Sequence, residues 1–352
     1  MHGTHLTRQN EDHPQAEQKR SPYHTDSWAN SPAQSPDLFP YFAKFVTGEP
    51  VEQSTWLTDL ELMHHYTSST FLTMPRAHEL QPLWQLEVPK LALSHVFLLH
   101  QLLSVSAYHL TYLHPDRPNL PICASQHQSK AVVGLRSALA TINEESCQEV
   151  FLGSSLLSIC AFASFAAREG EQRRLDDLLD VFLLVRGMRD IINSYTDVLM
   201  NSRVKSMFVK GAPDEPAPAL NAMIEQLQQL KIPDAFEPDD VSLCRESIAS
   251  IIAWTEKSMA TTNTPELRIA MSWSLSVSAE FLDLVRLRHP VALSILAHYC
   301  VILDRAGLTH WYIRGWGKSV LSDITDSIDP NWRVLLDWPL MATEAMARET
   351  GQ

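Results

Sequence analysis

The chain has 352 residues, of which 45% are hydrophobic and 20% charged, a composition that is ordinary for a globular domain. Its formal net charge is −13, from 28 lysines and arginines against 41 aspartates and glutamates. Binding to nucleic-acid phosphates or to an anionic membrane surface needs a concentrated cationic surface, so this charge argues against both.

The first 54 residues predict a disordered tail, because prolines and polar residues recur there without apolar periodicity. The apolar patch 38–42 interrupts this tail and is interpreted as a segment that docks on the domain or binds a partner. No export signal and no uncharged apolar stretch of roughly 18 residues stands out, so no membrane association is expected. Five widely spaced cysteines favour reduced thiols and a location in the nucleus or cytoplasm.

Helical periodicity runs from about residue 55 to 345, which predicts a single all-α domain followed by a short C-terminal tail, 346–352. Prolines and polar loops separate roughly ten helices in this array. We expect them at 58–71, 91–112, 124–142, 148–167, 175–192, 219–231, 240–258, 267–287, 291–306, 309–327 and after residue 330. The stretch 91–112 is apolar almost all round, so this helix should be central.

The sharpest candidate for catalytic chemistry is an aspartate-rich helical pattern formed by Asp176, Asp177 and Asp180. Carboxylates at this spacing can share Mg²⁺ with a diphosphate, as they do in terpene cyclases. The same residues also fit a plain amphipathic helix, with leucines inside and carboxylates in water. No second Asn-Asp-x-x-Ser-x-x-x-Glu metal motif follows, which favours the surface-helix interpretation.

A lipid-sized pocket is a second candidate site, expected between the helices at 91–112, 152–167 and 291–303. Small residues in these helices leave room either for close packing or for a ligand. The candidate lining residues are Phe97, His100, Gly153, Leu157, Phe162, Leu296 and Tyr299. The competing interpretation is a fully packed core, in which the aromatic side chains fill the space and His100 is simply a core histidine.

Several segments, in order, resemble the fungal-specific transcription factor domain of the sterol uptake control protein family. The resemblance spans about 57 to 345. The segments that carry it are Asp59–Thr70, Val88–Ala92, Phe97–His100, Ser106–Leu110, Leu183–Arg189, His289–Tyr299, Gly315–Gly317 and Trp338–Pro339.

This resemblance implies an all-helical regulatory domain, and some members of the family bind sterol in an apolar pocket. Members normally carry an N-terminal zinc cluster of six cysteines that reads DNA, whereas residues 1–58 contain no cysteine. We therefore expect a transcription regulator-like module without its own DNA-binding cluster and without a cofactor. Its expected partners are a sterol or other isoprenoid, and protein partners or a second copy of the chain.

An enzyme is the alternative that the sequence leaves open. A helical domain without a zinc cluster could be an atypical, Mg²⁺-dependent terpene cyclase of secondary metabolism. In that case Asp176, Asp177 and Asp180 would hold the metal beside an apolar pocket. A pure interaction scaffold is the third interpretation.

Overall fold

The computed structural model describes residues 53–76, 78–166, 172–208, 218–233 and 236–349. These residues belong to one compact unit, Gln53–Gln352. The described part contains α-helices and short 3₁₀ or π turns but no strand, so the predicted all-α class is confirmed. The predicted tail over 1–52, including patch 38–42, lies outside the described residues.

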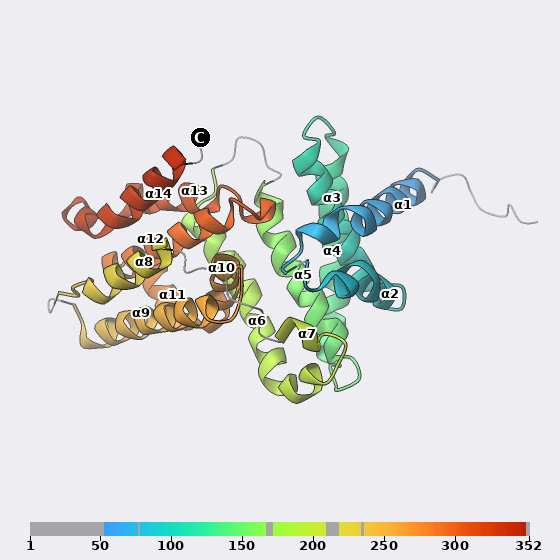
Figure 1. Ribbon diagram of the computed structural model, residues 1–352, viewed down its shortest axis with the longest axis horizontal. Helices are drawn as coiled ribbons and strands as arrows, with labels where there is room; N and C mark the ends of the chain where they lie inside the picture. Colours follow the sequence, from blue (N-terminus) through green and yellow to red (C-terminus); the bar gives the residue numbers. More distant parts are fainter. Residues whose placement is uncertain (1–52, 77, 167–171, 209–217, 234–235, 350–352) are drawn as a thin grey trace, which may run out of the picture. The chain divides into compact units, whose positions relative to one another are not determined.

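Fourteen α-helices occur in the described ranges, more than the ten expected (Figure 1). They are α1 (Gln53–Ser68), α2 (Val88–Ala92), α3 (Val96–Leu113), α4 (Asn119–Ala140), α5 (Cys147–Ala166), α6 (Leu175–Met200), α7 (Lys205–Phe208), α8 (Pro218–Gln229), α9 (Pro238–Met259), α10 (Pro265–Ser276), α11 (Ala279–Arg286), α12 (Pro290–Ala306), α13 (Trp316–Ser327) and α14 (Asp337–Glu349). Short turns are η3 (Thr70–Thr73), η4 (Leu83–Glu87), η5 (Trp311–Ile313) and η6 (Pro330–Leu336).

The N-terminal helices pack around α3, as its uniformly apolar sequence predicts. Helix α3 contacts α1, α4 and α5, and twelve of its residues are buried. Its small polar residues are bonded to neighbouring backbone, because a buried hydroxyl without a partner is costly. Ser106 donates to the Leu62 carbonyl of α1 at 2.7 Å, and Ser104 donates to the Ala124 carbonyl of α4 at 3.0 Å.

Helix α12 is the centre of the C-terminal helices, and fifteen of its residues are buried. It contacts α8, α9, α10, α11, α13 and α14. Helix α6 contacts α5 on one side and α10 and α13 on another, so it joins the N-terminal helices to the C-terminal ones (Figure 1). The core is therefore continuous through α6.

Several helix boundaries differ from those predicted, and two of the differences have a clear local reason. The predicted helix 267–287 is two helices, because Ser278 caps α11 by accepting a hydrogen bond from the Phe281 N–H at 3.1 Å. The predicted helix 309–327 begins only at Trp316, after Gly315 adopts a left-handed conformation with φ of +78°. Helix α14 continues to Glu349, past the predicted domain end at 345.

Helix α5 is long and apolar enough to cross a membrane by length and composition alone. However, 78% of its apolar window, Cys147–Phe165, is buried inside the fold. A helix that is apolar all round and covered by other helices is what the interior of a large helical domain requires. The packing of α5 against α3, α4 and α6 accounts for its composition.

Candidate functional site

The three candidate metal ligands lie at the surface near the start of α6. Asp176 is 67% exposed and binds Arg288, with both carboxylate oxygens 3.1 Å from one guanidinium nitrogen. Asp177 accepts a hydrogen bond from the Arg174 backbone N–H at 2.8 Å, which caps the helix. Asp180 is exposed.

The rest of this segment behaves as an amphipathic helix. Leu175, Leu178 and Leu179 are buried, on the face opposite the carboxylates. Among the described residues no group of three or more His, Cys, Asp or Glu side chains is placed to hold a metal ion. The geometry gives Asp176 and Asp177 structural partners, while the metal assignment itself stays a prediction.

The predicted pocket residues lie in different parts of the helical core, with different neighbours. Phe97 of α3 packs against Gly153 of α5, where an added β-carbon would lie 2.8 Å from the Phe97 ring. The ring therefore fills the space that Gly153 leaves. His100 lies one turn further along and pairs with His127 of α4, their Nδ1 atoms 2.9 Å apart.

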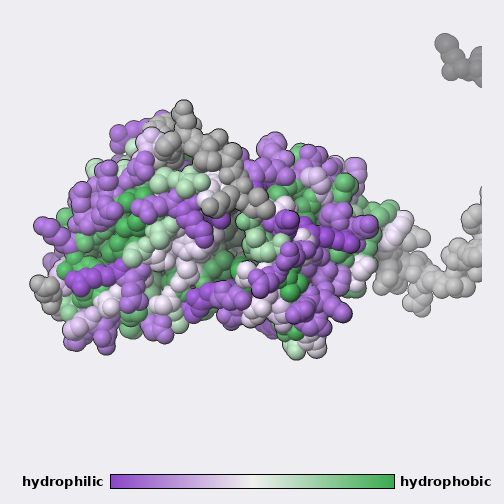
Figure 2. Space-filling model, turned by 60° about the horizontal axis from the view of Figure 1, so that its bottom comes forward, coloured by the Kyte–Doolittle hydropathy of each residue, from purple (hydrophilic) through white to green (hydrophobic). Residues whose placement is uncertain are grey.

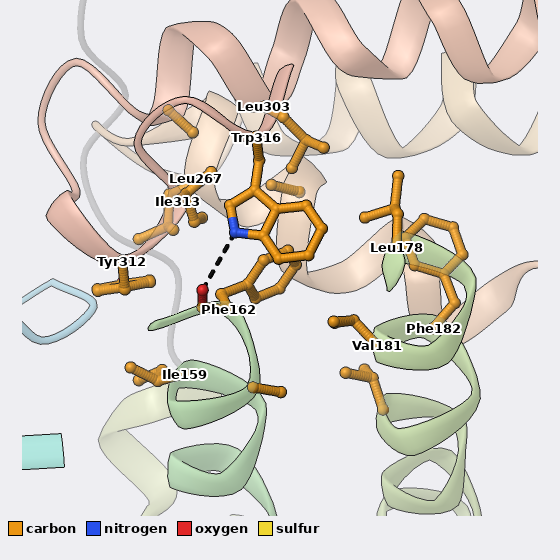
Figure 3. Close-up of a cluster of buried hydrophobic side chains, with 14 of the residues drawn as sticks. Ile159, Phe162, Leu178, Val181, Phe182, Leu267, Leu303, Tyr312, Ile313 and Trp316 are labelled. Carbon is orange, nitrogen blue, oxygen red and sulfur yellow. Dashed lines mark hydrogen bonds between the residues drawn. The ribbon is translucent and has the colours of Figure 1, made fainter. Parts of the chain in front are cut away.

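Phe162 of α5 lies in the part of the core where α5, α6, α12 and α13 meet (Figure 3). The indole N–H of Trp316 donates to the Phe162 carbonyl at 3.1 Å, and the two rings meet edge-on with centroids 5.4 Å apart. Figure 3 shows Leu178 and Phe182 of α6 and Leu303 of α12 closing around Trp316. These side chains are buried in the hydrophobic core, and the large indole of Trp316 packs among them.

Leu296 and Tyr299 lie on α12 and are fully buried. The Tyr299 hydroxyl donates to the Ala270 carbonyl of α10 at 2.6 Å, and its ring contacts Phe182 and Trp273. Burial raises the Tyr299 pKa well above its ordinary value, so this hydroxyl stays protonated and acts as a donor. Leu157 is likewise buried in the core, on α5. Ligand binding by these predicted residues stays a prediction.

A groove that the sequence did not indicate is lined by His298 of α12, two residues beyond Leu296. It has a volume of about 370 Å³ and is bounded by the end of α8, by α12, by η6 and by the start of α14. Residues that line it include Gln226, Leu230, Lys231, His298, Trp338 and Met341. In the sequence His298 is an isolated histidine, and only the fold brings it beside Trp338.

His298 forms the floor of this groove and is 2% exposed. Its ring stacks on the Trp338 indole, with centroids 5.2 Å apart and planes 11° from parallel. Its Nδ1 lies 2.8 Å from the Ser294 carbonyl, and because a carbonyl can only accept, Nδ1 carries the proton. Burial lowers the His298 pKa to about 4, so the ring is neutral at pH 7 and Nε2 is an acceptor.

Comparison with known proteins matches part of the chain to a family model. Residues 61–205 match the fungal specific transcription factor domain, so this segment, α1 to the start of α7, carries that domain. The resemblance predicted from the sequence is confirmed.

The relatives are transcription factors and control proteins. The chain is 24% identical over 316 residues to a Zn(2)-C6 fungal-type transcription factor of Gibberella zeae, covering 82% of the chain and 62% of that relative. It is 26% identical to the Zn(2)-C6 fungal-type transcription factor afumD of Aspergillus fumigatus, covering 72% of the chain and 69% of the relative. Sterol uptake control protein 2 of Candida albicans is 32% identical over 109 residues, which is 31% of the chain and 15% of that protein. The chain thus spans less than two thirds of the first and third relatives.

Proposed function

We propose that the chain is a transcription regulator whose helical domain responds to a small apolar molecule. The observation that carries the proposal is the match of residues 61–205 to the fungal specific transcription factor domain. Similarity to a Zn(2)-C6 factor over 82% of the chain extends this likeness beyond α7. The proposed place of action is accordingly the nucleus.

The name of the Candida relative refers to control of sterol uptake. We therefore take a sterol or another isoprenoid as the ligand class of the proposed regulator. The fold supports ligand control in one respect, since α6 contacts α5, α10 and α13 and so physically joins both halves of the core. Packed helices move relative to one another in discrete shifts. A shift of one helix that contacts α6 therefore changes the packing of the other helices that contact α6.

Protein partners, including a second copy of the chain, belong to the same proposal. Helix α1 exposes three apolar side chains close together in sequence, Trp56, Leu57 and Leu60, each at least 49% exposed. Large aromatic and aliphatic side chains on a surface are typical of contact sites between proteins. Figure 2 shows one face of the molecule, on which further apolar patches lie between hydrophilic ones.

The magnesium-dependent enzyme gains no support from the geometry. Asp176 is engaged by Arg288, and Asp177 is engaged by the backbone of Arg174. Incubation of the protein with farnesyl diphosphate and Mg²⁺, followed by product analysis, tests this alternative. A cyclised product that disappears in Asp180→Ala would establish the enzyme instead.

The proposed regulatory function is tested by tethering the chain to DNA beside a reporter gene. The full chain is fused to an unrelated DNA-binding domain and expressed with a reporter gene that carries the matching operator. We expect reporter expression to differ from that given by the DNA-binding domain alone, and to return to that level when the operator is deleted. Equal expression with and without the fused chain, in cells both replete with and depleted of sterol, would refute the proposal.

A further inference from the structure

The groove at His298 is a site whose chemistry can be derived from the residues that form it. Its floor is an uncharged imidazole ring, buried and held in one orientation from two directions. The Ser294 carbonyl binds Nδ1 at 2.8 Å, and the Trp338 indole stacks on the ring face. The orientation of Nε2 is therefore fixed before any ligand arrives, which lowers the entropic cost of binding.

Nε2 of His298 has no hydrogen-bond partner among the described residues, and the residue is only 2% exposed. Nε2 of His298 is not one of the fully buried unpaired polar atoms of the described residues, so it keeps some access to solvent. The groove gives this nitrogen access to a molecule from outside. The missing partner must supply a hydrogen rather than a lone pair, because Nε2 is unprotonated.

The residues that line the groove indicate which kind of molecule can bind there. Leu230 and Met341 line the groove with apolar surface, and Trp338 adds an aromatic surface. The rim carries one cation and one anion, Lys231 and Asp337, so it favours neither sign of charge. A neutral molecule with an apolar body fits these walls.

The volume restricts the size. At about 370 Å³ the groove lies near the lower end of the range for small-molecule sites, roughly 300 to 1,000 Å³. A one- or two-ring compound can fit in such a space, whereas a four-ring sterol with its tail would protrude. The groove thus selects a compact ligand.

We propose that the groove between α8, α12, η6 and α14 is a binding site for a compact, neutral, hydroxyl-bearing ring compound, whose O–H donates to Nε2 of His298. The ring packs between Leu230, Met341 and the Trp338 indole. This inference narrows the ligand of the proposed function from a full sterol to a compact ring compound, and it rests on that function only for the effect of binding on transcription. Binding itself is independent of that role.

The test compares two probes that differ in one hydrogen-bond donor. Isothermal titration calorimetry of the full chain at pH 7 is carried out with 2-naphthol and with 2-methoxynaphthalene, which keeps the rings but has no O–H. We expect 2-naphthol to bind about fivefold more tightly, the effect of one net hydrogen bond. Equal affinities, or no binding of 2-naphthol up to its solubility limit, would overturn the proposal.

Two variants locate the binding. His298→Phe keeps a ring for Trp338 to stack on but removes the acceptor, so the fivefold preference should fall to about one. Met341→Trp places a bulky side chain at a position that is 62% exposed, so the fold is retained while the groove is filled. Both probes should then lose at least tenfold in affinity, and unchanged 2-naphthol affinity in Met341→Trp would show that it binds elsewhere.

The two experiments distinguish a failure of the proposed binding site from a failure of the proposed regulatory function. A chain that binds 2-naphthol with the expected preference but leaves the tethered reporter unchanged keeps the site and loses the proposed function. A chain that changes the reporter but shows no preference between the two probes keeps the function and loses the site.

Discussion

Substitution of Gly317 by alanine tests whether α12 and α13 pack as closely as the structure shows. Gly317 lies in the first turn of α13, and the backbone of α12 passes directly over it. A β-carbon there would lie 2.6 Å from both the backbone nitrogen and the β-carbon of Asp304, and would also collide with the Cys300 carbonyl oxygen. These are atoms of a buried helix, which no side-chain rotation can move away.

The size of the effect follows from this contact. Inserting a methyl group into a packed interior costs typically about 1–3 kcal/mol, and occasionally more when the neighbours cannot yield. Alanine offsets part of that cost, because it is better than glycine in a helix by about 1 kcal/mol at an interior position and less near an end. We expect Gly317→Ala to lower the free energy of unfolding by about 2 kcal/mol.

Gly153→Ala is the matched control for the same chemical change. Its β-carbon would lie 2.8 Å from the Phe97 ring, but this neighbour is the far end of a half-buried side chain that can turn aside. The gain in helix preference then cancels most of the cost, and we expect a change of less than about 1 kcal/mol.

Urea unfolding followed by circular dichroism at 222 nm measures both variants under the same conditions. The expected order of stability is wild type and Gly153→Ala close together, with Gly317→Ala clearly below them. A Gly317→Ala variant as stable as the wild type would refute the close approach of α12 and α13. A larger loss in Gly153→Ala than in Gly317→Ala would refute the distinction between side-chain and backbone neighbours.

Three further substitutions and one change of pH have defined outcomes. Asp177→Ala removes the cap of α6 and should lower the free energy of unfolding by about 1 kcal/mol, whereas the exposed Asp180→Ala should change it by less than about 0.5 kcal/mol in the same urea titration. Trp316→Ala leaves a cavity in the cluster of Figure 3 and should lower the free energy of unfolding by about 3–5 kcal/mol. A smaller decrease in the free energy of unfolding would contradict the central position of Trp316. Burial lowers the pKa of His109 and of His298 to about 4, against about 6.5 in the unfolded chain, so below pH 6.5 the unfolded state binds more protons and stability falls. Between pH 7 and pH 5 each histidine should contribute a loss of about 2 kcal/mol, and a urea midpoint that does not move in this interval would contradict their burial.

The sequence predicted the helical class and most helix positions, because apolar periodicity is a local property. It placed the start of α6 at Leu175 and the end of α12 at Ala306, as observed. It joined α10 to α11, because a serine cap such as Ser278 is a weak signal inside a long apolar pattern. It also missed the break before Trp316, where Gly315 adopts positive φ.

The candidate site was less predictable, because it depends on which side chains meet. Small size at Gly153 suggested free volume, but the sequence contains no sign that Phe97 of another helix occupies it. The groove shows the opposite case. His298 and Trp338 are 40 residues apart in number, and neither has a local pattern that marks a site, yet their rings stack at 5.2 Å. Such contacts are set by helix packing rather than by spacing along the chain.

The most direct test of the regulator is the tethered reporter measured with three versions of the chain in parallel. These are the wild type, the double variant Asp176→Ala/Asp180→Ala, and Gly317→Ala. A regulator that depends on its folded helical domain and not on carboxylate chemistry predicts equal reporter expression for the first two. It also predicts expression closer to the level of the DNA-binding domain alone for Gly317→Ala at raised temperature. Reporter expression that never departs from that level in the wild type would contradict the account, as would loss of the effect in the double variant with the fold intact.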